Sequence, residues 1–94
     1  FAYAQNNLGL MYGKGRGVAE DAVAAVTWYR LAADQGFADA QFNLGFMYSK
    51  GRGVAEDAVE AVTWYRLAAD QAGTGKAYQA GDIKGSANPP GGQN

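Results

Sequence analysis

A tandem repeat with a period of 36 residues dominates this chain and limits the folds open to it. Shifted by that period, residues 1–36 and 37–72 differ at only six aligned positions. The differing pairs are Tyr3/Asp39, Asn6/Phe42, Leu10/Phe46, Gly13/Ser49, Ala24/Glu60 and Gly36/Ala72. Identity this close indicates duplication of one structural unit. A period in this range is typical of solenoids, whose units bury their faces against their neighbours.

The first helix of each unit is predicted from an apolar stripe. Ala4, Leu8 and Tyr12 recur every four residues and indicate a helix over residues 2–12. Glycines within residues 13–17 supply the positive φ angles that end helices. The second unit carries the same stripe and the same turn, apart from a serine at the first turn position.

Small apolar residues predict the second helix, over residues 22–34. Asp21 is expected to accept hydrogen bonds from free amides at its start, and Gly36 is expected to end it. The side expected to be buried consists of Ala22, Ala25, Val26, Tyr29, Ala32 and Ala33. We therefore predict an all-α fold, a short right-handed α/α solenoid (superhelix) of two helix-turn-helix repeats.

The repeat pattern fails after residue 72. We expect residues 73–84 to be a degenerate remnant of a third repeat, in which Ala77 to Ile83 form a short helix that caps the second unit. Residues 85–94 carry no apolar side chain beyond Ala87 and the two prolines. Such a segment buries too little surface to offset its ordering entropy, so a disordered tail is expected there.

Composition narrows the possible functions. Eight basic and nine acidic side chains give a net charge of -1, which argues against a nucleic-acid partner or an anionic membrane. The chain has no His and no Cys, so it lacks the usual proton shuttle, the commonest transition-metal ligand and thiolate sites. We expect that the chain is not an enzyme and that it binds neither a cofactor nor a metal ion. A hydrolase of cell-wall material is the least favoured of three hypotheses, because no nucleophile–base–orienter set can be assembled.

Several motifs resemble binding or catalytic sites but are better explained as turns, helix caps or packing residues. The sequence GKGRG at residues 13–17 lacks the spacing of a phosphate-binding loop and precedes acidic Glu20 and Asp21, so we interpret it as a turn. Those carboxylates are interpreted as solvated helix caps rather than an acid–base pair. Trp28 and Tyr29 are interpreted as packing residues rather than a platform for a base or sugar. The equivalent residues of the second unit receive the same interpretations.

The spacing shared by the two units resembles that of the Sel-one-like repeat (SLR) family. In the first unit the resemblance is carried by Ala4, Leu8-Gly9, Tyr12, Gly15-x-Gly17-Val18, Asp21, Ala25, Trp28-Tyr29, Ala32-Ala33 and Gly36. The second unit carries the same residues at the equivalent positions, except that Ala72 replaces Gly36. The variant WYRLAADQGFADAQFNLG is similar to bacterial members. The resemblance covers residues 1–72 and implies an α/α superhelix related to tetratricopeptide repeats, acting as an adaptor or scaffold.

Candidate binding residues lie where the two copies differ. On the first helix the differing positions fall within an arc of about 80°, nearly opposite the shared apolar stripe. The resemblance implies that this face lines a concave groove, and an apolar cluster on a non-core face more often marks a contact site than neutral drift. The expected partner contacts are Tyr3, Asn6, Leu10, Asp39, Phe42 and Phe46. Asn7 and Asn43 are expected to hold a partner's backbone, because an amide offers both a donor and an acceptor.

Two hypotheses on function follow. The leading one is a protein–protein interaction module that binds a peptide or protein partner through this first-helix face. The alternative is a purely structural fragment of a longer repeat array. No preceding helix covers Ala4 and Leu8 of the first unit, so we also expect head-to-tail association between copies. Because the chain begins with Phe1, its natural start is expected upstream, and cytoplasm, periplasm and secretion all stay open as compartments.

Overall fold

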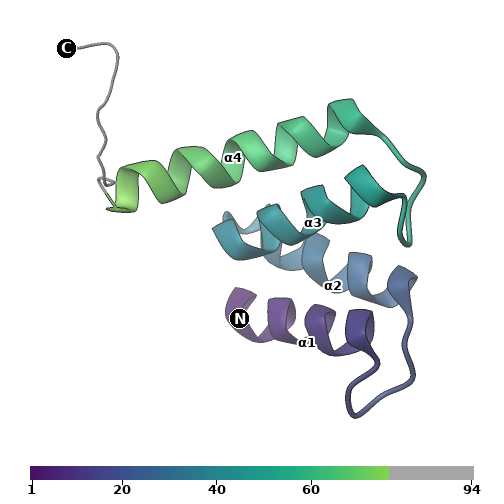
Figure 1. Cartoon of the computed structure of the whole chain (residues 1–94). Coiled ribbons are helices and arrows are strands. Elements are labelled where there is room, and N and C mark those ends of the chain that lie inside the picture. Colours follow the sequence, from purple (N-terminus) through teal and green to yellow (C-terminus); the bar gives the residue numbers. More distant parts are fainter. Residues whose placement is uncertain (77–94) are drawn as a thin grey trace, which may run out of the picture.

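The computed structural model describes residues 1–76, with side chains described up to residue 71. These residues form the helices α1 (Ala2–Lys14), α2 (Ala22–Asp34), α3 (Ala38–Lys50) and α4 (Ala58–Lys76) (Figure 1). The helix expected over Ala77 to Ile83 and the tail expected over residues 85–94 lie outside the described residues.

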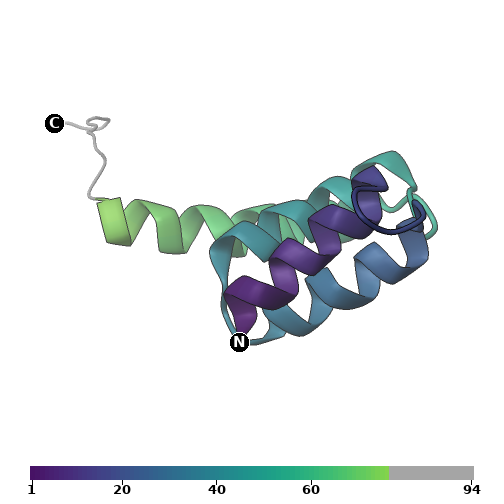
Figure 2. The same ribbon diagram turned by 90° about the horizontal axis from the view of Figure 1, so that it is seen from below.

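The four helices run antiparallel to their chain neighbours and form two pairs that stack on each other (Figures 1 and 2). α1 pairs with α2, α3 pairs with α4, and α2 packs on α3 between the pairs. Among the described residues α1 also contacts α3, whereas α2 and α4 do not touch. The side formed by α1 and α3 is therefore the inner side of the stack. The predicted all-α arrangement of two helix-turn-helix repeats is confirmed.

The turn and cap predictions are confirmed within the repeats. α1 and α3 each end at a glycine in the left-handed conformation, Gly15 and Gly51, both with φ 66°. Asp21 Oδ1 accepts a hydrogen bond from the Ala24 amide at 3.0 Å, and Asp57 repeats this bond at the start of α4. α1 runs to Lys14, slightly beyond its predicted end, as is common for helix termini.

The second helix of the second repeat is longer than its counterpart. α2 ends at Asp34, and Gly36 follows with φ 90°. The second copy has Ala72 in place of Gly36, and α4 continues through it to Lys76. A residue with a Cβ resists the positive φ that ends a helix here, so the helix does not stop. Residues 73–76, expected to begin a separate remnant, are instead the last part of α4.

Close approach between the two helices of a repeat depends on glycine in the first helix. A Cβ on Gly9 would lie 2.6 Å from the Tyr29 ring, and one on Gly45 would lie 2.9 Å from the Tyr65 ring. These contacts are too short for any side chain at either position. The core between the repeats is built from residues of α2 and α3: Ala25, Val26, Tyr29, Ala32, Ala33, Ala40, Leu44 and Met47.

Candidate functional site

The predicted apolar stripe of the first helix is buried in one repeat and exposed in the other. Ala40 and Leu44 on α3 are completely buried, whereas Ala4 is exposed and Leu8 has 40% of its surface accessible. The stripe packs against the preceding repeat rather than against the second helix of its own repeat. α1 has no preceding helix among the described residues, which leaves its stripe open.

The expectation that the differing positions form a non-core face is wrong for the first repeat. Asn6 is buried, and its Oδ1 accepts a hydrogen bond of 3.0 Å from Nδ2 of Asn43. Leu10 is half-buried and packs against the core. A helical wheel gives the direction of these side chains, but it does not reveal that the next repeat covers them.

The same positions in the second repeat are open. Phe42 is 54% exposed and Phe46 is 37% exposed, and Asp39 is also exposed on α3. The Phe42 ring lies 5.3 Å from the Tyr65 ring, and the Lys50 ammonium lies 5.8 Å from the centre of the Phe46 ring. At these two positions the expected contact residues are therefore more accessible in the second repeat than Asn6 and Leu10 are in the first.

Of the remaining candidate residues, Tyr3 and Asn43 contact other side chains of the chain, and Asn7 is exposed. Tyr3 is exposed but lies edge-on to Phe37, with ring centres 6.1 Å apart. Asn7 is exposed on α1. Asn43 donates to Asn6, so part of its hydrogen-bonding capacity is used inside the chain.

A hollow of about 390 Å³ between α1 and α3 brings several of these residues together, and we call it the inner groove. Its lining residues are Leu10, Gly13, Lys14, Tyr29, Phe42, Asn43, Phe46, Met47 and Arg52. Tyr3 and Asn7 lie outside it, in a second hollow along α1, and Asp39 lies in a third beside Tyr65. The structure thus joins Leu10, Phe42, Asn43 and Phe46 in one site and separates the others from it.

Basic side chains border the inner groove. Arg52 donates to the Gly13 carbonyl oxygen and to Oε2 of Glu20, both at 3.2 Å. This ion pair joins the two repeats, and its side chains remain accessible to water, Arg52 to 39% and Glu20 to 64%. At the bottom of the groove, burial raises the pKa of the Tyr29 phenol above its usual value of 10.0, with Arg52 opposing the shift. Tyr29 therefore stays neutral at physiological pH, and the positive charges at the groove come from Lys14, Lys50 and the paired Arg52.

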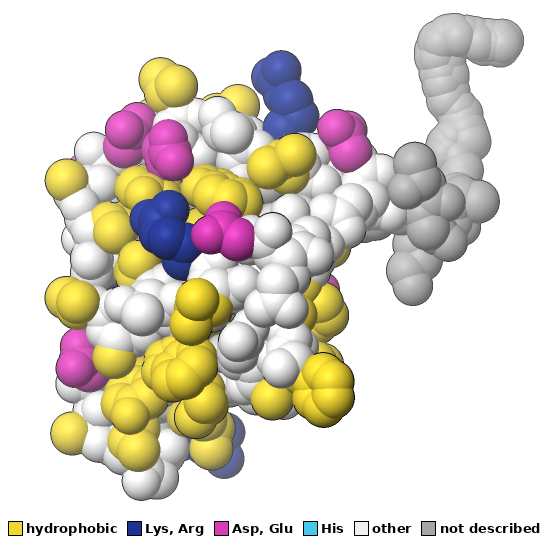
Figure 3. Space-filling view, turned by 180° about the vertical axis from the view of Figure 1, so that it is seen from behind, with side chains coloured by type: hydrophobic (Ala, Val, Ile, Leu, Met, Phe, Trp, Pro, Cys, Tyr) yellow, Lys and Arg dark blue, Asp and Glu magenta, His cyan; other side chains and the backbone are white. Residues whose placement is uncertain are grey.

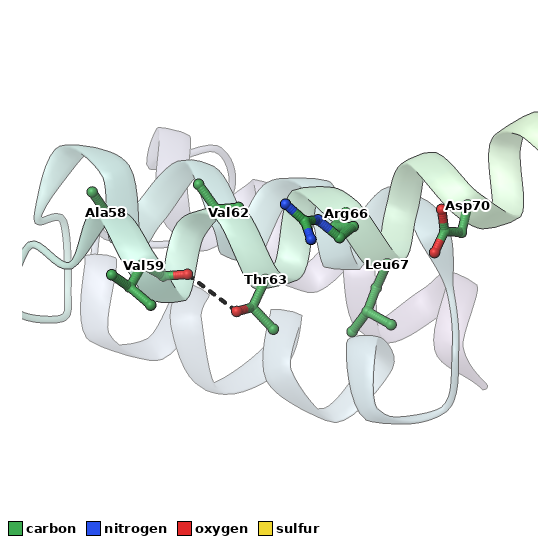
Figure 4. Close-up of a pocket in the computed structure, with 7 residues that line it drawn as sticks. All are labelled: Ala58, Val59, Val62, Thr63, Arg66, Leu67 and Asp70. Atoms are coloured by element: carbon green, nitrogen blue, oxygen red, sulfur yellow. Dashed lines mark hydrogen bonds between the residues drawn. The ribbon is translucent and has the colours of Figure 1, made fainter.

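A further surface, whose residues are not among the predicted partner contacts, lies on the outer side of α4. A hollow of about 510 Å³ follows this helix and includes Val59, Val62 and Arg66 (Figure 4). Val62 is 50% exposed, although its copy Val26 on α2 is only 6% exposed because α3 covers it. The signal was present in the sequence, since α4 repeats the apolar face that α2 buries. Figure 3 shows how exposed hydrophobic side chains gather in patches on one side of the molecule, with charged side chains between them.

Of the two Trp-Tyr pairs, Tyr29, Trp64 and Tyr65 are packing residues, and Trp28 is half-buried. Tyr29 is buried against Gly9, and Trp64 packs on the edge of the core, its indole Nε1 buried without a hydrogen-bond partner among the described residues. Within residues 1–71, no cluster of Cys, His, Asp or Glu is suited to hold a metal ion. No helix in the described part is both long and apolar enough to span a bilayer.

The Sel1 repeat model matches residues 2–37 and 38–73, which is most of the chain. The chain belongs to the Sel1 repeat family. The matched segments begin one residue later than the units defined by the internal alignment. Sel1 repeats form a non-catalytic helical fold that generally serves as a scaffold for protein interactions.

Bacterial Sel1 repeat proteins of known structure share this fold. One is a Sel1 repeat protein from Oxalobacter formigenes, with 56% identity and a TM-score of 0.74 over 74% of this chain. Another is a protective antigen present in uropathogenic Escherichia coli strains, with 50% identity and a TM-score of 0.74 over 74% of this chain. The present chain spans 29% and 15% of the lengths of those two chains. No curated protein matches it.

Proposed function

We propose that this chain is a protein-interaction module that binds a peptide or protein segment in the inner groove. The exposure of Phe42 and Phe46 carries the proposal. These rings stand where the first repeat has Asn6, which is buried, and Leu10, which is half-buried. Large aromatic side chains that remain open on the inner side of a helical repeat stack favour a contact with another molecule.

The lining of the inner groove favours a particular kind of ligand. Leu10, Phe42, Phe46 and Met47 offer apolar surface for an aliphatic or aromatic anchor. Lys14 lies in the lining, and Lys50 lies beside the Phe46 ring. A segment with one apolar anchor next to acidic side chains would match both properties, because the lysines attract the carboxylates while the rings bury the anchor.

A peptide selection tests this function. Peptides from a random display library are selected on the immobilised chain, and their affinities are then measured for the variant Phe42→Ala with Phe46→Ala. We expect affinity to fall by about tenfold or more, because interface aromatics often contribute at least that much. Helicity should be unchanged, since neither ring belongs to the buried core.

The matched control is Val23→Ala with Leu31→Ala, which removes two exposed apolar side chains from α2, outside the inner groove. It should leave peptide affinity unchanged. Selected peptides that bind the phenylalanine variant as tightly as the wild type would contradict the proposed site.

The alternative is a purely structural segment of a longer repeat array. It is favoured by the fact that this sequence covers only 29% and 15% of the two related bacterial chains. That alternative gains if no peptide selected on the chain depends on Phe42 or Phe46.

A further inference from the structure

We propose that copies of this chain stack end to end, with α1 of one copy packing on α4 of the next in the geometry in which α3 packs on α2. The proposal commits to a second copy as the occupant of both exposed end surfaces. It goes beyond the proposed peptide binding and is tested at Leu8 and Val62, which lie outside the inner groove, so each idea can fail without the other.

The first end surface, the N-terminal face, consists of Ala4, Leu8 and Met11 on α1. Leu8 and Met11 are about 40% exposed and Ala4 is exposed too. Their copies in the second repeat are among the most buried residues of the chain. Those copies are Ala40, Leu44 and Met47, which α2 covers. The N-terminal face therefore has the composition of a packed interface but lacks a cover among the described residues.

The other end surface, the C-terminal face, consists of Val62, Arg66 and Ala69 on α4 (Figure 4 shows the first two). All three are exposed. Their copies on α2 are covered by α3, and Val26 and Ala33 are almost fully buried. The face that receives α3 inside the chain is thus presented a second time at its other end.

The polar contacts of the internal joint would be reproduced by identical residues. Inside the chain, the Arg30 guanidinium donates to the Tyr48 hydroxyl, and Nε2 of Gln41 donates to the Ala33 carbonyl at 3.2 Å. Between copies these become Arg66 with Tyr12 and Gln5 with the Ala69 carbonyl. The Arg52–Glu20 ion pair likewise becomes Arg16 with Glu56. The apolar faces and these polar pairs thus specify one register between copies.

Contacts along the inner edge of the joint would change. The Asn6–Asn43 hydrogen bond would be replaced by Phe42 beside Asn7, because the copies differ at this position. The Tyr3–Phe37 ring contact would be replaced by Asp39 beside Phe1. The joint between copies is therefore weaker than the joint between repeats, which makes the association reversible and dependent on concentration.

Such a joint uses two different surfaces and leaves one of each free at the ends of every open assembly. The contact is heterologous, so copies add in an open series unless the rotation closes a ring. The net charge of -1 opposes this growth only weakly.

Two complementary variants of the full 94-residue chain test the proposal by analytical ultracentrifugation. Leu8→Glu places a charge on the N-terminal face, and Val62→Glu places one on the C-terminal face. Both side chains are well exposed in the single copy, so each variant should fold, as circular dichroism will verify. We expect each variant alone to be monomeric at concentrations at which the wild type forms a series of oligomers, because the joint would bury an unpaired carboxylate.

The decisive sample is an equimolar mixture of the two variants. Each retains one intact face, so the mixture should form a 1:1 dimer and nothing larger. The control is Val59→Glu, which should associate like the wild type, because the copy of Val59, Val23, remains exposed even where α3 covers α2. A wild type that stays monomeric would overturn the proposal. So would continued association of either single variant, or a mixture that stays monomeric.

Discussion

At the residue scale, Gly17 and Gly53 have the same backbone conformation but different surroundings. Replacing each of them therefore distinguishes the energetic cost of a positive φ from the cost of a steric overlap. Gly17 and Gly53 occupy equivalent turn positions, with φ 75° and 71°. A Cβ on Gly17 would meet nothing within 4 Å. A Cβ on Gly53 would overlap the Ala22 carbonyl and lie 2.9 Å from Val26 Cγ2. The turn at Gly17 thus has free space around it, whereas the same turn at Gly53 is enclosed between the two repeats.

We therefore predict that Gly53→Ala destabilises the chain more than Gly17→Ala. Both variants place a Cβ at positive φ, which costs about 1 kcal/mol. Only Gly53→Ala must also push α2 away from the turn before α4. Urea unfolding at low protein concentration, where copies stay apart, measures both free energies of unfolding. Equal losses would contradict the close packing of this turn on α2.

Local chemistry explains which residues could be assigned from sequence. The cap made by Asp21 depends only on nearby amides, so the sequence predicts it correctly. The burial of Asn6 depends on Asn43, a residue of the next repeat. The helical wheel could not indicate that contact, because it records the direction of a side chain but not the element that fills the space.

At the element scale, α3 packs against α2 and α4, and α2 is the other central helix because it packs against both α1 and α3. Its alanines allow both neighbours to approach closely: Ala25 and Ala32 are completely buried. Glycines on the first helices extend the same close approach to the helix pairs. Small residues, rather than large interlocking side chains, thus set the spacing of this stack.

Larger side chains at these alanines should separate the helices. We predict that Ala32→Leu and Ala68→Leu each lower the free energy of unfolding by about 1–3 kcal/mol, because overpacking forces strained rotamers and backbone shifts. Ala69→Leu serves as the control, since Ala69 is exposed. Thermal melts at low concentration compare the three. A melting temperature unchanged by Ala32→Leu would show that the helix spacing is not set by this residue.

The helix boundaries could be predicted from sequence for α2 but not for the end of α4. The bounds of α2 agree with the sequence prediction because Asp21 and Gly36 mark its two ends. The end of α4 was not predicted, because the repeat pattern suggested a stop that Ala72 does not provide. A single substitution at a helix end therefore changes the length of a whole element.

At the scale of the whole molecule, the repeat itself made the fold predictable. Two nearly identical units must adopt nearly identical helix pairs, and the pairs must bury a shared face. The candidate site was harder to predict, because its accessibility depends on which repeat has a neighbour. Phe42 is open and Asn6 is closed for that reason alone. The same asymmetry leaves Leu8 and Val62 exposed at opposite ends of the stack.

Each end of the described stack presents a surface whose counterpart is buried between the two repeats. The most direct test is the melting temperature of the 94-residue chain over a wide range of protein concentration. If copies cover each other's end faces, association stabilises the folded state, and the melting temperature rises as concentration increases. A sharp melting transition at one temperature, independent of concentration, would show that the end faces do not pair.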